Sequence, residues 1–192
     1  MAKAFKNGAH GITGTLHSAE RKLLRELFSD VITMLEERAE VHRLPEDIDP
    51  LYALTGMRPE SMDLPPVSDP GLARLLPDAS DDPVVAAEHR RLTEADLIAQ
   101  KAGRLREAQF LLETDKIVLD KDKAQRFAQA LNDVRLVLAE RLEIRDEQDA
   151  ARVSQMLDAA DVETPEEYLA LVYNLVSWVQ DTLMGALMDA ES

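Results

Sequence analysis

The sequence predicts a mainly α-helical fold, a single-domain helical bundle over residues 1–192 with a small N-terminal β-hairpin or arm over residues 1–17. Three observations carry this prediction. Long stretches place apolar residues at i, i+3 and i+4, the spacing of an α-helix with one buried face. Asp-Pro pairs and a Thr-Pro-Glu-Glu sequence mark helix starts. A length of 192 residues suits one domain with its own core.

The N-terminal segment alternates in polarity over residues 12–16, which is typical of a short strand. Ser18 then stands where an N-cap is expected, and Glu20 follows in the first turn, where a carboxylate favours the helix dipole. We therefore expect a helix from Ser18 to about Val41. Its apolar face consists of Leu23, Leu24, Leu27, Phe28, Val31, Met34 and Leu35.

Residues 45–83 hold eight of the nine prolines, so they cannot form one long helix. An Asp directly precedes a Pro at positions 49, 69 and 82, and such a pair serves as N-cap and first helical residue. This pattern predicts short helices at 50–54 and 70–76, followed by a long helix from Pro83 to about Glu113.

The second half of the chain repeats a strand followed by helices. A short strand is expected at 117–119, where it could pair with the N-terminal hairpin, and Asp120 or Asp122 caps a helix to about Ile144. Another helix is expected over 147–160. The last helix starts at a Thr164 capping box and is apolar on nearly every side, which predicts a place at the centre of the bundle.

An offset of 103 residues relates the two halves. It aligns Leu16 with Leu119, Asp30 with Asp133, Val31 with Val134, Leu35 with Leu138, Glu37 with Glu140, Arg38 with Arg141 and Glu40 with Glu143. Two interpretations stay open: an internal duplication of a strand–turn–helix unit, or chance similarity between amphipathic helices. A duplication would let the two strands pair and relate the two helices by a pseudo-twofold axis.

Charge and composition exclude several classes of partner. The chain has 22 basic and 37 acidic residues, and a net charge of −15 repels nucleic acid and anionic membrane surfaces. The apolar stretch from Tyr168 to Met188 is interrupted by polar residues and has acidic flanks, so we expect a buried helix there and no membrane partner. With no cysteine and no secretory signal pattern, we expect a cytoplasmic protein.

Motifs for catalysis or for cofactor and metal binding are missing from the sequence. Gly8, Gly11 and Gly14 lack the spacing and the lysine of a phosphate-binding loop, and no Glu has a His three residues later. Glu36, Glu40 and His42 come nearest to a metal cluster, and a solvated helix end explains them better. We therefore predict no catalytic residue, no metal and no cofactor.

Three groups of residues are candidates for binding. Asn132, Asp133 and Arg135 form an unusual polar group within a periodic helix: either a ligand-binding network or a polar face paired to a neighbouring element. The helix from Pro83 also carries a basic face, which is either solvated or meets an acidic neighbour or partner. Its residues are Arg90, Arg91, Lys101, Arg104 and Arg106. Trp178, Leu183 and Met184 are candidates for the interface of a homo-oligomer.

Several short segments, in order, resemble a known family. They are Leu54-Thr55-Gly56-Met57, Asp69-Pro70, Arg74-Leu75-Leu76-Pro77-Asp78, Arg91-Leu92-Thr93-Glu94 and above all Asn132-Asp133-Val134-Arg135-Leu136. The chain resembles, over nearly its whole length, an actinobacterial domain-of-unknown-function family, number two thousand and seventeen. The resemblance implies an intracellular protein without established activity, encoded near the adaptor of the Clp protease and a metalloprotease.

The function expected from these observations is a non-enzymatic protein-interaction or regulatory factor, linked through the gene context to Clp-type proteolysis. One alternative is a small-molecule-binding protein or enzyme with a pocket between helices, anchored by Asn132, Asp133 and Arg135. A second alternative is a structural homodimer that buries Trp178, Leu183 and Met184.

Overall fold

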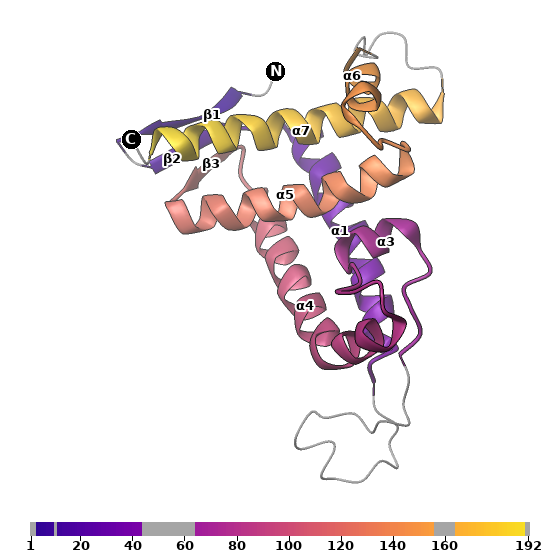
Figure 1. The fold of residues 1–192 in the computed structure, drawn as a ribbon. Helices are drawn as coiled ribbons and strands as arrows, with labels where there is room; N and C mark the ends of the chain where they lie inside the picture. Colours follow the sequence, from indigo (N-terminus) through magenta and orange to yellow (C-terminus); the bar gives the residue numbers. More distant parts are fainter. Residues whose placement is uncertain (1–2, 10, 44–63, 156–163, 191–192) are drawn as a thin grey trace.

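The computed structural model describes residues 3–9, 11–43, 64–155 and 164–190, which form helices and one small sheet (Figure 1). In chain order, the elements are β1 (Lys3–Gly8), β2 (Gly11–Thr15), α1 (Ser18–Glu40), α3 (Pro70–Leu75), α4 (Pro83–Leu111), β3 (Lys116–Leu119), α5 (Lys121–Arg141), α6 (Glu147–Gln155) and α7 (Pro165–Asp189). The predicted mainly α fold class is confirmed. The helix expected at 50–54, and residues 156–160 of the helix expected at 147–160, lie outside the described residues.

The sheet consists of β1, β2 and β3 in that order, and both pairings are antiparallel. β1 and β2 form the hairpin that the N-terminal sequence predicts. β3 pairs with β2 in a register that places Ile12 opposite Leu119, and the side chains of Ile12, Ile117 and Leu119 are buried. The predicted pairing of the hairpin with a strand at 117–119 is therefore confirmed.

Gly11 stands where this sheet tolerates no side chain. Its φ is +98°, and a Cβ built there would lie 2.6 Å from the carbonyl oxygen of Leu119. We predict that Gly11→Ala lowers the free energy of unfolding in urea by about 2 kcal/mol, because backbone strain of this kind costs roughly 1–3 kcal/mol. Gly8→Ala is the control, since a Cβ there has its nearest contact at 3.9 Å. Equal losses in the two variants would contradict this prediction.

Side-chain caps start the helices largely as predicted. The confirmed caps are Asp69 of α3, Asp82 of α4, Asp120 of α5 and Thr164 of α7. The cap of α1 was predicted one residue too late, because the N-cap is His17 and Ser18 is already helical. The backbone N–H of His17 donates to Glu20 Oε2 at 2.8 Å, so the glutamate in the first turn satisfies a group that a helix leaves unpaired.

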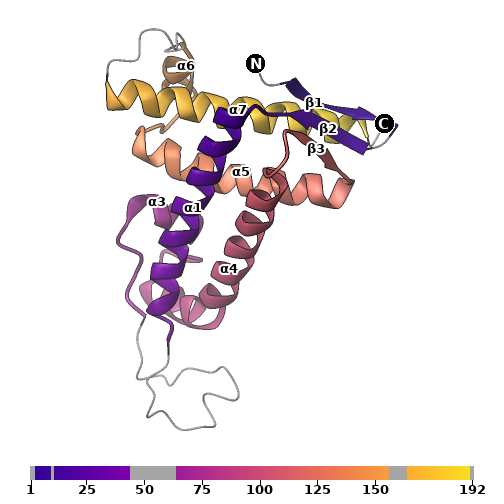
Figure 2. The same ribbon diagram turned by 180° about the vertical axis from the view of Figure 1, so that it is seen from behind.

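The helices pack as two pairs. α5 and α7 run alongside each other, and α1 and α4 extend together away from them, as both views of the ribbon agree (Figures 1 and 2). The sheet lies against α7 near the C-terminal end of that helix. α5 contacts α1, α3, α4 and α7, so α5 occupies the centre.

The predicted central position of α7 is therefore wrong. α7 packs on α5, on β1 and, toward its N-terminal end, on α6. Its side chains Trp178 and Met188 are 37% and 66% exposed. Although α7 is apolar on nearly every side, part of its surface is therefore exposed within the described part of the chain. Among the described residues, no helix, α7 included, is long and apolar enough to cross a membrane.

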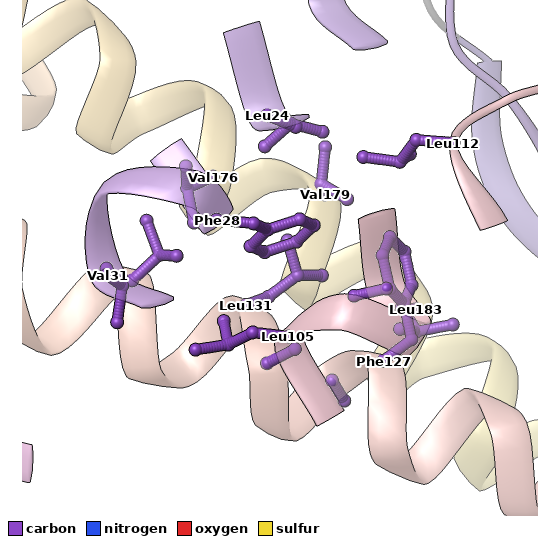
Figure 3. Packing of buried hydrophobic residues seen from close by; sticks show 14 of the residues in the cluster. Leu24, Phe28, Val31, Leu105, Leu112, Phe127, Leu131, Val176, Val179 and Leu183 are labelled. Atoms are coloured by element: carbon purple, nitrogen blue, oxygen red, sulfur yellow. The ribbon is translucent and has the colours of Figure 1, made fainter. Parts of the chain in front are cut away.

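The core joins the two strand–turn–helix units that the 103-residue offset relates (Figure 3). The offset superposes the N-caps His17 and Asp120. It also superposes four pairs of buried side chains: Leu24 with Phe127, Phe28 with Leu131, Val31 with Val134 and Leu35 with Leu138. The rings of Phe28 and Phe127 meet edge to face with centroids 6.3 Å apart. The two units therefore share local structure and core positions, and their strands pair directly.

Candidate functional site

A groove of about 610 Å³ lies between α4, α5 and α7. Its lining consists of Lys101 and Arg104 of α4, Gln125, Ala128, Gln129, Asn132 and Asp133 of α5, and Gln180, Met184, Leu187 and Met188 of α7. The polar side chains come from all three helices, while the thioethers and Leu187 form an apolar wall on α7. The groove thus combines charge, amide groups and apolar surface.

Asp133 is the charged centre of this groove. It is only 3% exposed, and its Oδ1 accepts a hydrogen bond from Lys101 Nζ at 2.6 Å. Arg104 Nη2 lies 3.8 Å from Oδ2 on the other side of the carboxylate. The buried negative charge is therefore compensated by two cations of α4, which is the condition for burying a carboxylate at tolerable cost.

Not all three residues predicted to bind a ligand line the groove. Asn132 and Asp133 both line the groove, whereas Arg135 does not belong to its lining. Arg135 Nη2 donates to Asn132 Oδ1 at 3.4 Å, and this amide links Arg135 to the groove. Asp133 is paired to a neighbouring helix, which was one of the two interpretations of this polar group.

The basic face of α4 meets acidic neighbours. The pairs are Arg90 with Asp78, Arg91 with Glu88, Lys101 and Arg104 with Asp133, and Arg106 with Glu36. Four of these five cations pair with carboxylates outside α4. This face therefore mainly forms ion pairs with other parts of the same chain. Only Lys101 and Arg104 among them line the groove.

Three atoms at the groove are buried and make no hydrogen bond within the described part of the chain. They are Gln180 Oε1, Asp133 Oδ2 and Arg104 Nε. An unsatisfied buried polar atom costs about 1–3 kcal/mol, so native structures usually supply it with a partner or water. Their concentration around one groove makes it a candidate binding site.

A second buried charge cluster lies where the C-terminal end of α1 meets α4. Glu94 Oε1 accepts a hydrogen bond from Arg38 Nε at 2.6 Å, and it also interacts with His42 Nε2 at 2.7 Å. Arg38 also donates to the carbonyl oxygen of Pro65 at 2.7 Å. Burial by itself raises the pKa of the Glu94 carboxyl, but the hydrogen bonds from His42 and Arg38 outweigh it and hold that pKa below its ordinary value.

This cluster was not among the sites predicted from the sequence. His42 was expected beside Glu36 and Glu40, whereas His42 pairs with Glu94 and Glu36 pairs with Arg106. A signal was present: Arg38 continues the apolar spacing of α1, and Glu94 stands one turn before the buried Ile98 of α4. When charged residues stand at positions where the helical spacing predicts buried apolar side chains, they indicate a buried ion pair. No group of metal-binding side chains occurs among the described residues.

The three predicted interface residues do not share one surface. Leu183 is fully buried within the chain, so it cannot contact a second copy in this structure. Trp178 and Met184 are 37% and 43% exposed. Met184 belongs to the wall of the groove, whereas Trp178 borders another hollow, beside α6.

Comparison with known families supports the resemblance seen in the sequence. The family model described as Domain of unknown function (DUF2017) matches residues 2–187. The chain belongs to this family. No curated protein and no solved structure matches the chain.

The groove of this DUF2017 member presents polar and apolar groups side by side. Among the described residues, its lining contains amides, two cations, one carboxylate and apolar side chains. The carboxylate is already engaged by Lys101 on one oxygen. The groups available at the surface are amides, cations and thioethers, which can form hydrogen bonds, ion pairs and apolar contacts.

Proposed function

We propose that this DUF2017 member is a non-enzymatic protein-interaction or regulatory factor whose groove receives a segment of a partner protein. The observation that carries the proposal is the groove between α4, α5 and α7, where an apolar wall faces a charged centre. Methionine side chains adapt to different partner surfaces because they are unbranched and flexible. Met184 and Met188, 43% and 66% exposed, supply such a wall.

The charges of the groove define the class of segment. Lys101 and Arg104 contribute two positive charges against the single negative charge of Asp133, within a chain of net charge −15. The groove is therefore a locally positive region on an acidic protein. A segment that carries a carboxylate beside an apolar side chain complements both the cations and the α7 wall.

We also propose the cellular process and the compartment in which this protein acts. The gene context implied by the family resemblance favours Clp-type proteolysis, and the composition favours the cytoplasm. One hydrophobic cluster that extends from Phe5 to Leu187 supports a single domain over residues 1–192. The Clp adaptor and the neighbouring metalloprotease are therefore the first partners to test.

An isosteric charge change in the groove tests the proposal. Gln129 lines the groove and is exposed, so Gln129→Glu adds one negative charge with little change in shape. We predict that this variant binds its partner about tenfold more weakly, because a like charge facing the partner's carboxylate opposes binding. Gln148→Glu on α6 is the control, since it makes the same change at an exposed position outside the groove.

The measurement is affinity capture from the lysate of the native host with tagged wild type, both variants and an unrelated protein of matched net charge. The expected result is a stoichiometric partner retained by wild type and Gln148→Glu and depleted with Gln129→Glu. Equal recovery with Gln129→Glu, or no partner specific to the chain, would contradict the proposal. Recovery of a Clp component would support the proposed process as well.

A small-molecule ligand is the second candidate function. The unsatisfied Gln180 Oε1, Asp133 Oδ2 and Arg104 Nε favour it, because a ligand with both donors and acceptors could satisfy them after small side-chain adjustments. A thermal-shift screen with metabolites and metals tests this candidate. A ligand that stabilises wild type but not Asn132→Leu would support it, and a screen in which nothing raises the melting temperature would speak against it.

A further inference from the structure

One face of the sheet belongs to the core, and the outer face is positively charged. The three strands contain Lys3, Lys6 and Lys116, and none of the 37 acidic residues of the chain lies in these strands. The three lysines are exposed and line a hollow of about 420 Å³, whose lining also includes Thr13 and Thr15. These five side chains are called the lysine face below.

A β-bulge places two of these lysines on the same face. Lys3 pairs with Thr15 and Lys6 pairs with Thr13, so three steps along β1 correspond to two steps along β2. In a regular strand, residues three apart point to opposite faces, because side chains alternate. The extra residue in β1 sets both lysines on the outer face, and bulges commonly re-aim side chains in this way. Lys116 completes the face, since it pairs with Thr15 from the other side of β2.

The side chains of the lysine face have no partner within the part of the chain that the structure describes. Cations on the helices commonly pair with carboxylates, as Lys101 does with Asp133. None of the three lysines forms such a pair there, and neither threonine hydroxyl makes a hydrogen bond. Asp115, next to Lys116 in sequence, accepts that residue's backbone N–H. The face therefore offers three ammonium groups and two hydroxyls, all of which can donate hydrogen bonds to an anion.

The chemistry of this face favours a small anion over a macromolecule. Nucleic acid would extend beyond the hollow onto a chain of net charge −15, and the lining has no aromatic side chain on which a base could stack. Protein interfaces centre on aromatic and large apolar side chains and are depleted in lysine. Repulsion from distant acidic residues is screened beyond about 8 Å at physiological ionic strength, so a small anion interacts mainly with the three nearby lysines.

We propose that the lysine face binds a small ligand with two or more adjacent phosphate groups. Lys3 and Lys116 lie on either side of β2, two strand spacings or about 10 Å apart. Their ammonium groups can therefore hold separate phosphates of one ligand, while Thr13 and Thr15 donate hydroxyl hydrogen bonds between them. The proposal does not rest on the function of the groove, whose lining shares no residue with this face.

Isothermal titration calorimetry of the full chain with inorganic tripolyphosphate tests the ligand class, with orthophosphate, ATP and a glutamate-rich peptide titrated in parallel at one ionic strength. We expect tripolyphosphate to bind at least about tenfold more tightly than orthophosphate, because it engages more charge-assisted hydrogen bonds. Tighter binding of ATP would identify a nucleotide as the source of the phosphates, and equal or weaker binding would identify the phosphate chain alone. No binding of tripolyphosphate, binding no tighter than that of orthophosphate, or tighter binding of the peptide would overturn the proposal.

Two double variants of equal charge locate the site. Lys6→Gln with Lys116→Gln removes two cations of the lysine face, whereas Lys22→Gln with Arg25→Gln removes two cations from a separate hollow between α1 and α4. All four side chains are exposed, so both variants should fold. We predict that the first variant binds tripolyphosphate at least about tenfold more weakly and that the second binds it like wild type. Unchanged binding by the first variant, or equal loss in both, would refute the proposal.

Discussion

Glu94→Gln lowers the free energy of unfolding by about 3–5 kcal/mol, the cost of breaking a buried ion pair from one side. Glu94 is 4% exposed and Arg38 is 7% exposed, so removal of the carboxylate leaves the guanidinium charged and buried. His42 loses its partner at the same time, since its Nε2 lies 2.7 Å from Glu94 Oε1. The effect is large because water cannot replace the lost charge.

The measurement is urea unfolding at neutral pH, with Glu88→Gln as the control. Glu88 pairs with Arg91 at the surface of the same helix, so its replacement should leave stability close to wild type. A Glu94→Gln variant as stable as Glu88→Gln would show that the buried cluster contributes nothing to folding.

The pH dependence of this difference follows from the lowered pKa of Glu94. Its ordinary pKa is 4.5, and the folded value is lower. The stabilisation from Glu94 is therefore complete above its unfolded pKa and is lost as the pH falls through the folded pKa. We expect the stability gap between wild type and Glu94→Gln to be constant near neutrality and to narrow in acid. A gap that widens in acid would contradict the lowered pKa.

Phe127→Ala is expected to cost about 3–5 kcal/mol, because it opens a cavity among large side chains that cannot collapse to fill it. Phe127 is 1% exposed, and its ring contacts those of Phe5 and Phe28 at centroid distances of 6.1 and 6.3 Å. It therefore ties β1 and α1 to α5. Figure 3 shows Phe127 and Phe28 together in the core.

Phe110→Ala provides the matched control for this prediction. Phe110 lies on α4 and is 70% exposed, so its truncation should change stability by less than about 0.5 kcal/mol. Thermal and urea unfolding of both variants make the comparison. Similar losses for the two phenylalanines would mean that the core does not centre on Phe127.

Most helix starts and the pairing within the sheet could be predicted from the sequence. Asp69, Asp82 and Asp120 each precede a helix because their side chains accept backbone N–H groups that only neighbouring residues can supply. The pairing of the hairpin with a strand at 117–119 was also expected from the repeated strand–turn–helix pattern, whereas its register was not. The caps involve residues close in sequence, and for that reason they can be predicted from one chain.

Features that depend on distant residues were predicted less well. The apolar circumference of α7 indicated burial but not which helix is central, because that choice depends on how α5 contacts four other helices. Glu94 and His42 are 52 residues apart, and nothing local relates them. The composition of the groove was partly predicted, since Asn132 and Asp133 drew attention as polar residues within a periodic helix, whereas Gln180 did not.

Site-specific photo-crosslinking in the native host tests the central claim, binding of a partner in the groove, most directly. A photoreactive phenylalanine analogue replaces Gln129 in the groove, or Gln148 outside it as the control. The groove account predicts a discrete protein adduct at position 129 that is absent at position 148 and is suppressed by adding Met184→Glu to the same wall. The same adducts at both positions, or none specific to position 129, would contradict it.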